Sequence, residues 1–272
     1  MAAVRLDELD FGKLDMLDVR GTAVELFTAG SGAPLLYLHG MDGIEGAAPL
    51  LRELAKSFTV YAPSHPGFGA SALPKGMNRA DDLGYFYIDL LDALGLDRPA
   101  VAASSFGGWV ALELLTKEPA RASSLVLAAP LGLRTANRRE QYVADIFTMS
   151  RQDLAKRLQA SEPSEASNIF KMPEDRLRRT MRGDEALSLY GWTPYMHNPK
   201  LAMRLHRIAC PTLVLWGSAD ALVTPAYREA FAIALPQAGH EEIAGAGHLI
   251  HADQPAALAS RIAAFAAAPV AA

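Results

Sequence analysis

The stretch from Pro99 to Trp109 constrains the fold of this chain more than any other. Residues Val101 to Ala103 form an apolar run that is typical of a short buried strand. The run from Trp109 to Leu115 is also apolar and rich in good helix formers. So few residues separate the two runs that we expect the chain to pass from strand to helix through a one-residue corner. A residue at such a corner adopts a strained backbone conformation, and its side chain stands clear of the sheet.

Ser105 fits this corner better than its neighbour Ser104. The strand and the helix nearly touch at a corner, so small residues are needed two positions before it and two positions after it. For Ser105 these positions hold Ala103 and Gly107, whereas for Ser104 the later position would hold the bulky Phe106. The alternative is an ordinary serine–glycine turn between a strand and a helix.

Most of the remaining chain alternates between strand and helix patterns. Buried or half-buried strands are indicated at 16–29 (two strands that turn at 20–22), 35–38, 58–62, 101–103, 125–129, 211–216 and 240–244. Helical patterns occupy about 47–56, 80–94, 226–235 and 254–267. Strands that alternate with helices imply parallel pairing through right-handed crossovers. We therefore expect an α/β fold with helices on both faces of a mostly parallel, eight-stranded sheet.

Residues 132–207 interrupt this alternation because they contain no run typical of a buried strand. Amphipathic helices are expected there at 139–148, 151–158 and 173–190. We therefore predict a core made of residues 1–131 and 208–272, with a helical cap of residues 132–207 inserted between two core strands. Aromatic and methionine side chains of this segment, such as Phe147, Phe170 and Trp192, would either line a pocket or pack the cap onto the core.

Composition and charge exclude several classes of function. The net charge is −4 and no long basic run occurs, so nucleic acid is not an expected partner. A single cysteine, Cys210, excludes an internal disulfide. The chain shows neither a signal-peptide pattern nor an apolar run long enough to span a bilayer, so we expect a cytoplasmic protein without a membrane partner. The glycine-containing stretches 30–32 and 67–69 are not dinucleotide-binding motifs, and no cofactor is expected. A homodimer is compatible with the sequence.

The predicted corner resembles the nucleophile elbow, G-x-S-x-G, of the α/β-hydrolases, with Ala103 in place of the first glycine. In that family the nucleophile is followed along the chain by an acid and then by a histidine. Residues 216–220 place Asp220 just beyond a strand, and residues 245–248 place His248 in a glycine-rich loop before the last helix. The resemblance covers essentially the whole chain and implies Ser105 as nucleophile, Asp220 as acid and His248 as base.

The same resemblance implies an oxyanion hole built from two backbone N–H groups. One would come from Phe106, the residue after the nucleophile, at the start of a helix. The other would come from Met41, because His39-Gly40-Met41 resembles the family's HG-x loop after the third strand. In this interpretation His39 braces the loop and is not the base.

The family hosts many activities, and its fold does not choose among them. Its dehalogenases and epoxide hydrolases use an aspartate nucleophile, so Ser105 argues against both. The resemblance predicts a serine hydrolase that cleaves a small, apolar ester by acyl transfer. Two alternatives stay open: a C–C bond hydrolase of meta-cleavage-type diketones, although Leu249 stands where many of those enzymes carry tryptophan, and a receptor that retains the triad. His248 and His251 lack further ligands nearby in the sequence, so no metal site is expected.

Overall fold

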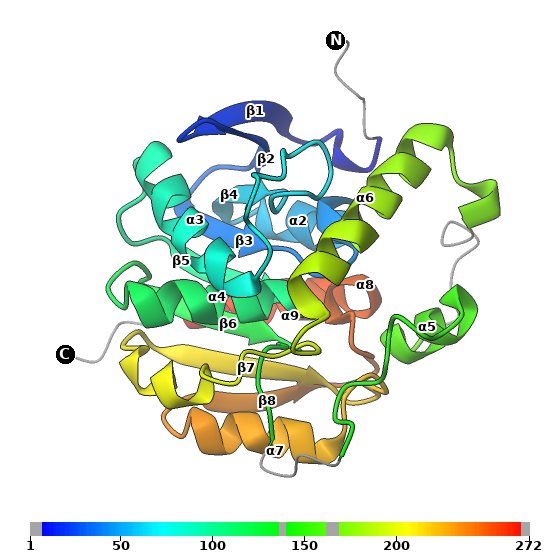
Figure 1. Cartoon of the computed structure of the whole chain (residues 1–272). Coiled ribbons are helices and arrows are strands. Elements are labelled where there is room, and N and C mark those ends of the chain that lie inside the picture. Colours follow the sequence, from blue (N-terminus) through cyan, green and yellow to red (C-terminus); the bar gives the residue numbers. More distant parts are fainter. Residues whose placement is uncertain (1–6, 136–139, 162–168, 268–272) are drawn as a thin grey trace.

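A computed structural model of the chain describes residues 7–135, 140–161 and 169–267 (Figure 1). Eight strands form one sheet in the order β1-β2-β4-β3-β5-β6-β7-β8. Strand β2 runs antiparallel to both of its neighbours, β1 and β4, and the other pairs are parallel. The expected eight-stranded, mostly parallel sheet is therefore confirmed. The strands are β1 (Lys13–Val19), β2 (Thr22–Ala29), β3 (Ala33–Leu38), β4 (Phe58–Pro63), β5 (Ala100–Ser104), β6 (Ser124–Ala128), β7 (Thr212–Gly217) and β8 (Gly239–Ile243).

Helices cover both faces of the sheet, as the sequence predicts. On one face α3 packs on α4, and the 3-10 helix η4 packs on both α4 and α7. On the other face α2 packs on α8 and α9, and Figure 1 shows α9 behind the sheet and α4 in front of it. The central strands β5, β6 and β7 are fully buried, which explains why their sequences are apolar without alternation. These helices are α2 (Ala48–Leu54), α3 (Ala80–Ala93), α4 (Phe106–Lys117), η4 (Ala202–Arg207), α7 (Pro225–Ala234), α8 (Ile250–Asp253) and α9 (Pro255–Ala266); two short helical segments, η1 (Asp7–Leu9) and α1 (Gly43–Gly46), lie near the start of the chain.

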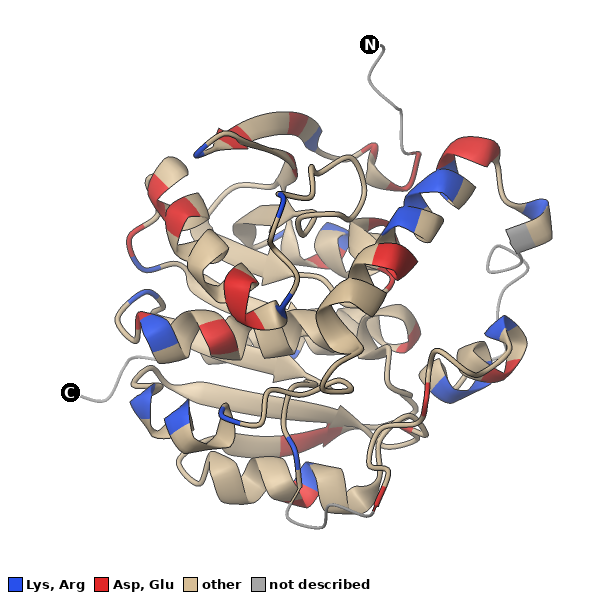
Figure 2. Ribbon diagram, in the orientation of Figure 1, with Lys and Arg blue, Asp and Glu red and all other residues tan. Residues whose placement is uncertain are grey.

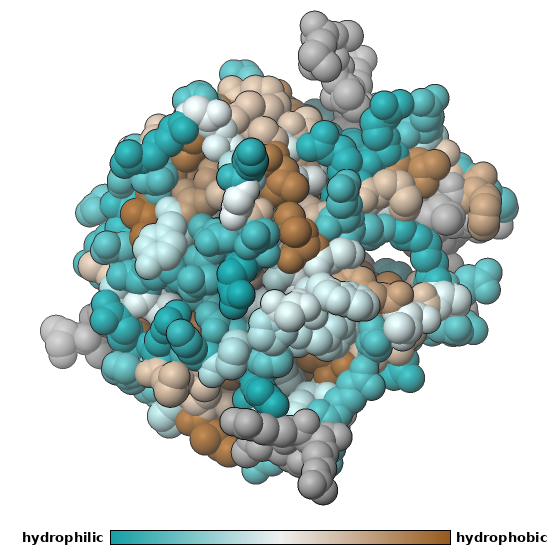
Figure 3. Space-filling view, in the orientation of Figure 1, coloured by the Kyte–Doolittle hydropathy of each residue, from teal (hydrophilic) through white to brown (hydrophobic). Residues whose placement is uncertain are grey.

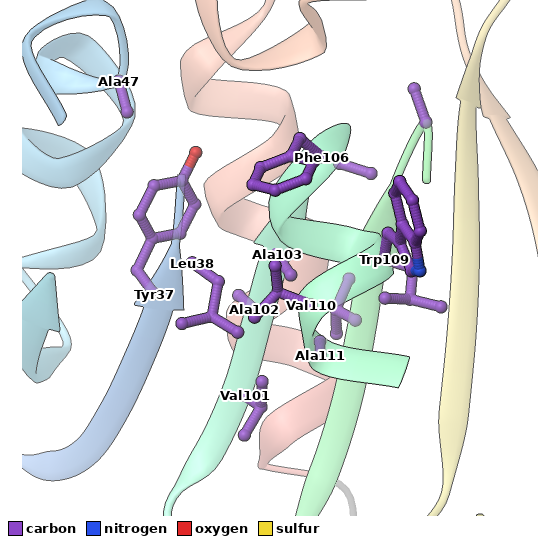
Figure 4. Packing of buried hydrophobic residues seen from close by; sticks show 14 of the residues in the cluster. Tyr37, Leu38, Ala47, Val101, Ala102, Ala103, Phe106, Trp109, Val110 and Ala111 are labelled. Atoms are coloured by element: carbon purple, nitrogen blue, oxygen red, sulfur yellow. The ribbon is translucent and has the colours of Figure 1, made fainter. Parts of the chain in front are cut away.

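Small and branched side chains bring α4 close to the centre of the sheet. Figure 4 shows Val110 and Ala111 of α4 next to Val101 and Ala102 of β5. All four side chains are almost completely buried. This tight packing fixes the start of α4 against the end of β5, which is where the predicted nucleophile lies.

Between β6 and β7 the structure contains α5 (Arg151–Leu158), the short η3 (Ile169–Lys171) and α6 (Glu174–Gly191). The helices predicted at 151–158 and 173–190 are confirmed. The guanidinium of Arg179 in α6 pairs with Glu25 of β2 and with Glu45 of α1, so α6 is tied to the core. Figure 2 shows further Lys and Arg residues along α6 and α5. The division into a core and a cap at residues 132 and 207 stays a prediction.

The helix predicted at 139–148 is wrong over its described residues. Arg139 itself lies outside the described part of the chain, and residues 140–149 contain no helix. Val143 forms an antiparallel bridge with Val223, and the N–H of Ala144 donates to the carbonyl of Leu222 at 2.9 Å. The chain around Val143 therefore pairs with a loop some 80 residues further along the chain, and a turn follows at residues 146–148. Local periodicity carries no information about such a partner.

Among the helices that the structure describes, none is long and apolar enough to cross a membrane.

Candidate active site

Ser105 stands at the corner between β5 and α4. Its backbone has φ 51° and ψ −116°, a strained conformation for a residue with a side chain. Two residues later, a Cβ on Gly107 would lie 2.2 Å from the carbonyl oxygen of Leu38 and 2.4 Å from that of His39. Only glycine therefore fits where α4 passes the end of β3, which is the steric reason for the small residue at this position of the elbow.

The two adjacent serines have different surroundings. The Oγ of Ser105 lies 2.8 Å from Nε2 of His248, whereas the Oγ of Ser104 accepts a hydrogen bond from the hydroxyl of Tyr37 at 3.0 Å. The hydroxyl of Ser104 is thus hydrogen-bonded inside the core. Of the two, Ser105 is the serine that the structure brings to the histidine.

His248 and Asp220 reach Ser105 from two neighbouring strands. Asp220 follows β7 and His248 follows β8, so both lie at the same edge of the sheet as the end of β5. The two loops pack backbone to backbone, because a Cβ on Gly217 would lie 2.0 Å from the carbonyl oxygen of Gly247. Glycine at 217 therefore allows the loop that carries Asp220 to contact the loop that carries His248.

The hydrogen bonds fix the tautomer of His248. Its Nδ1 lies 3.0 Å from Oδ2 of Asp220, and a carboxylate can only accept, so Nδ1 carries the proton. Nε2 then offers its lone pair to the hydroxyl of Ser105. The second oxygen of Asp220 accepts from the N–H groups of Leu222 at 2.9 Å and Val223 at 3.3 Å.

The hydrogen-bond partners of Asp220 stabilise its ionised form. Burial raises the pKa of this carboxyl, but His248 and the N–H groups of Leu222 and Val223 outweigh the effect, so its pKa lies below the usual value. Asp220 therefore stays ionised at neutral pH. An ionised carboxylate in this place orients the imidazole and stabilises the imidazolium that would form when His248 accepts a proton.

The loop that holds Met41 lies against the elbow. A Cβ on Gly40 would lie 3.3 Å from the Cβ of Ser105, so the chain at 40–41 passes directly beside the hydroxyl-bearing residue. Phe106 is the first residue of α4, and the amide N–H at such a position has no partner within its helix. Gly40 and Phe106 thus adjoin Ser105, and the N–H groups of Met41 and Phe106 stay the predicted donors of an oxyanion hole.

His39 braces that loop through backbone contacts. The N–H of His65 donates to Nε2 of His39 at 2.9 Å, so Nδ1 carries the proton and donates to the carbonyl of Gly40 at 2.7 Å. The ring is completely buried, which lowers the pKa of His39 to about 4 and keeps the ring neutral. Both ring nitrogens are thus used on the backbone.

The sequence interpretation missed a second histidine–carboxylate pair. Nε2 of His251 lies 2.7 Å from Oδ2 of Asp42, the residue that follows Met41. The local sequence around His251 carries no signal for a partner 209 positions away. Over residues 7–135, 140–161 and 169–267, no group of three or more His, Cys, Asp or Glu side chains could hold a metal ion.

A cavity of about 1020 Å³ opens beside this edge of the sheet. It lies next to the site at Met41 and Leu249, although its lining includes neither Ser105 nor His248, and it extends between α1, α2, α5 and α6. Figure 3 shows a hollow between α5 and α6. Phe147, Met149 and other apolar side chains line it, whereas Phe170 and Trp192 are exposed. The arginines that line the cavity are each paired with a carboxylate: Arg52 with Asp10, Arg151 with Asp184, Arg176 with Glu8, and Arg179 with Glu25 and Glu45.

Comparison with known proteins gives consistent results. The model of the alpha/beta hydrolase family matches residues 35–261. The chain is 29% identical over 237 residues to the dihydrolipoyllysine-residue acetyltransferase component of the acetoin cleaving system of Pseudomonas putida. The aligned region covers 82% of this chain and 63% of that protein. It is 35% identical over 118 residues to the 2-hydroxymuconate semialdehyde hydrolase of Pseudomonas sp. strain CF600, and the aligned region covers 42% of each protein. The chain thus spans less than two thirds of the length of either relative. The crystal structure of carboxylesterase CesB (YbfK) from Bacillus subtilis has a similar fold, with a TM-score of 0.78 and 19% identity over 97% of this chain and 96% of that one.

Proposed function

The chain belongs to the alpha/beta hydrolase family, and we propose that it is a serine hydrolase that cleaves an apolar ester by acyl transfer through Ser105. The observation that carries this proposal is the continuous series of contacts from the hydroxyl of Ser105 through His248 to Asp220, at 2.8 and 3.0 Å. A hydroxyl is a weak nucleophile until a base accepts its proton, and this series supplies the base and the group that orients it.

In the proposed mechanism, Nε2 of His248 accepts the proton of Ser105 while Oγ attacks the ester carbonyl. Asp220 stabilises the imidazolium that forms. The N–H groups of Met41 and Phe106 bind the oxyanion, and each such donor stabilises the transition state by about 3 kcal/mol. His248 then gives the proton to the leaving alcohol, and an acyl-enzyme remains. Water, activated by the same histidine, hydrolyses the acyl-enzyme and releases the acid.

The lining of the cavity supports a neutral substrate. An anionic acyl group would require a free cation, but the four arginines among the described residues of the lining are already paired with carboxylates. The apolar side chains between them would bind hydrocarbon. The volume of about 1020 Å³ lies at the upper end of the range for small-molecule sites, so esters larger than the small ones predicted from the sequence would also fit.

The second candidate is hydrolysis of a C–C bond in a meta-cleavage-type diketone. It is favoured by the 35% identity over 118 residues to a 2-hydroxymuconate semialdehyde hydrolase. Muconate denotes an acid, and the paired arginines of the cavity argue against an anionic substrate here. The third candidate is a receptor that keeps the triad. Such a receptor would react with a substrate once or very slowly.

A panel of nitrophenyl esters, set against a meta-cleavage substrate, tests the proposal. We expect multiple turnovers on the esters, labelling of Ser105 by a fluorophosphonate, and a fall in kcat of about 10⁴- to 10⁶-fold for Ser105→Ala. Ser104→Ala is the matched control, because that hydroxyl contacts Tyr37, and its effect on kcat should be mild. Full activity of Ser105→Ala would refute the proposal. Labelling without turnover would favour the receptor.

A further inference from the structure

We propose that Asp253 is a positioning residue that couples the end of helix α5 to His248. This inference rests on the proposed function, because it assigns Asp253 a role in holding the base. Asp253 is the last residue of α8, five positions after His248, and it lies outside the series of contacts from Ser105 to Asp220.

The carboxylate of Asp253 joins two segments that lie far apart in the sequence. Its Oδ2 accepts hydrogen bonds from the N–H of Gly247 at 2.8 Å and from the N–H of Ala160 at 2.9 Å. Its Oδ1 accepts from the hydroxyl of Ser161 at 2.7 Å and, at 3.4 Å, from the N–H of the same residue. One side chain therefore holds the residue before His248 and the two residues that lie just beyond α5.

A direct backbone bond completes the link on the other side of the histidine. The N–H of Leu249 donates to the carbonyl of Leu158, the last residue of α5, at 2.8 Å. Both neighbours of His248 in the chain are thus held in a set of hydrogen bonds shared with residues 158–161. His248 itself is 1% exposed.

The two backbones are in direct contact at Gly247. A Cβ at this position would lie 2.8 Å from the nitrogen of Ala160 and 2.9 Å from the carbonyl oxygen of Leu158. No side chain separates the segments, so a displacement of 158–161 must displace the histidine loop as well. Glycine at 247 is the sequence feature that permits this contact.

The consequence for the reaction follows from geometry. His248 must present Nε2 to Ser105 and Nδ1 to Asp220 at the same time, and both contacts depend on the position of its backbone. A misplacement of about 1 Å at a reacting group costs roughly 100-fold in rate. Leu158 and Leu249 also line the cavity, so the link lies between the cavity and the loop that carries His248.

The test compares Asp253→Ala and Asp253→Asn with the unmodified protein on a short-chain nitrophenyl ester. We expect Asp253→Ala to lower kcat by roughly 10- to 100-fold with little change in KM, because binding is retained while the base is misaligned. Asp253→Asn keeps one acceptor oxygen and should recover part of that loss. The rate of fluorophosphonate labelling of Ser105, measured well below the Tm, should fall in parallel with kcat.

Ser150→Ala provides a control at the opposite end of the same helix. The hydroxyl of Ser150 caps α5 by accepting from the N–H of Asp153 at 3.1 Å, and it donates to the carboxylate of Asp153 at 2.7 Å. Its loss should loosen the start of α5 and lower the Tm while kcat and the labelling rate stay unchanged.

The inference is overturned if Asp253→Ala folds and keeps its kcat, or if its kcat falls no further than that of Ser150→Ala at an equal change in Tm. If Asp253→Ala does not fold, Asp253→Asn decides the matter, since an unchanged kcat and labelling rate would also contradict the inference. Failure of the proposed function looks different, because the unmodified protein would then neither turn over the ester nor be labelled at Ser105.

Discussion

Two buried histidines three positions apart in the sequence, His248 and His251, each pair with an aspartate, and only His248 also contacts a hydroxyl. His248 pairs with Asp220 at 3.0 Å, and His251 pairs with Asp42 at 2.7 Å. Both histidines are 1% exposed. The second ring nitrogen of His248 contacts Ser105, whereas Nδ1 of His251 has no hydrogen-bond partner among the described residues. A buried histidine beside a carboxylate therefore becomes a candidate base only when its other ring nitrogen meets a hydroxyl.

The two carboxylates differ as well. Both oxygens of Asp220 are used, one by His248 and the other by backbone N–H groups, while Oδ1 of Asp42 has no partner in the described part of the chain. Burial raises the pKa of each carboxyl, and the adjacent histidine contributes to an opposite effect that leaves both pKa values below the usual one. We interpret the pair of Asp42 and His251 as a link between the loop of Met41 and helix α8.

The sharpest test of this difference is the removal of each imidazole. We expect His248→Ala to lower kcat by about 10⁴- to 10⁶-fold, because Ser105 loses its base. His251→Ala should lower kcat by less than about 10-fold but reduce the free energy of unfolding by about 1–3 kcal/mol, because it leaves the Asp42 carboxylate without its partner. Ester hydrolysis and urea denaturation measure the two effects. Equal losses of kcat would remove the distinction between the pairs.

Replacement of the two acids should give a smaller but still clear difference. Asp220→Asn should lower kcat by about 10⁴-fold, because an amide no longer holds the tautomer in which Nε2 is free to accept a proton. Asp42→Asn keeps an oxygen that can accept from His251, so we expect less than a tenfold fall. Steady-state kinetics on a nitrophenyl ester checks both values. A larger loss for Asp42→Asn would assign that carboxylate a direct part in the reaction.

The smallest effect concerns His39, a buried histidine that bonds to backbone atoms instead of a carboxylate. Its pKa of about 4 lies below that of an unfolded histidine, about 6.5, so the unfolded chain binds the extra proton first. The resulting stability is complete above pH 6.5 and is lost as the pH falls towards 4, by about 3 kcal/mol for this group. Burial also lowers the pKa of His65, which adds to the loss in the same window. Urea denaturation from pH 7 to 4 should show the decline, and His39→Gln should make it shallower.

The parts of the site that could be predicted are those that depend on local sequence or on a family pattern. The elbow was predicted because Ala103, Ser105 and Gly107 satisfy a steric requirement within a few residues. Asp220 and His248 were identified through their resemblance to family motifs, and the structure brings both to Ser105. Their roles in catalysis stay proposals until variants are measured.

Contacts between distant segments were not predictable. Val143 forms a bridge with Val223, and residues 140–149 contain no helix, although their pattern favours one. The partners of His251 and Asp253 lie 209 and about 92 positions away. A single sequence holds the residue types for such contacts but no sign of which ones meet.

The position of the base along the chain has a consequence for synthesis on the ribosome. Ser105 and His248 are 143 residues apart, and Asp220 also follows the nucleophile. At 5–20 residues per second, the ribosome needs roughly seven to thirty seconds to pass from one to the other. If Ser105 is the nucleophile that we propose, a nascent chain that already displays the elbow lacks its base until translation reaches the loop that carries His248.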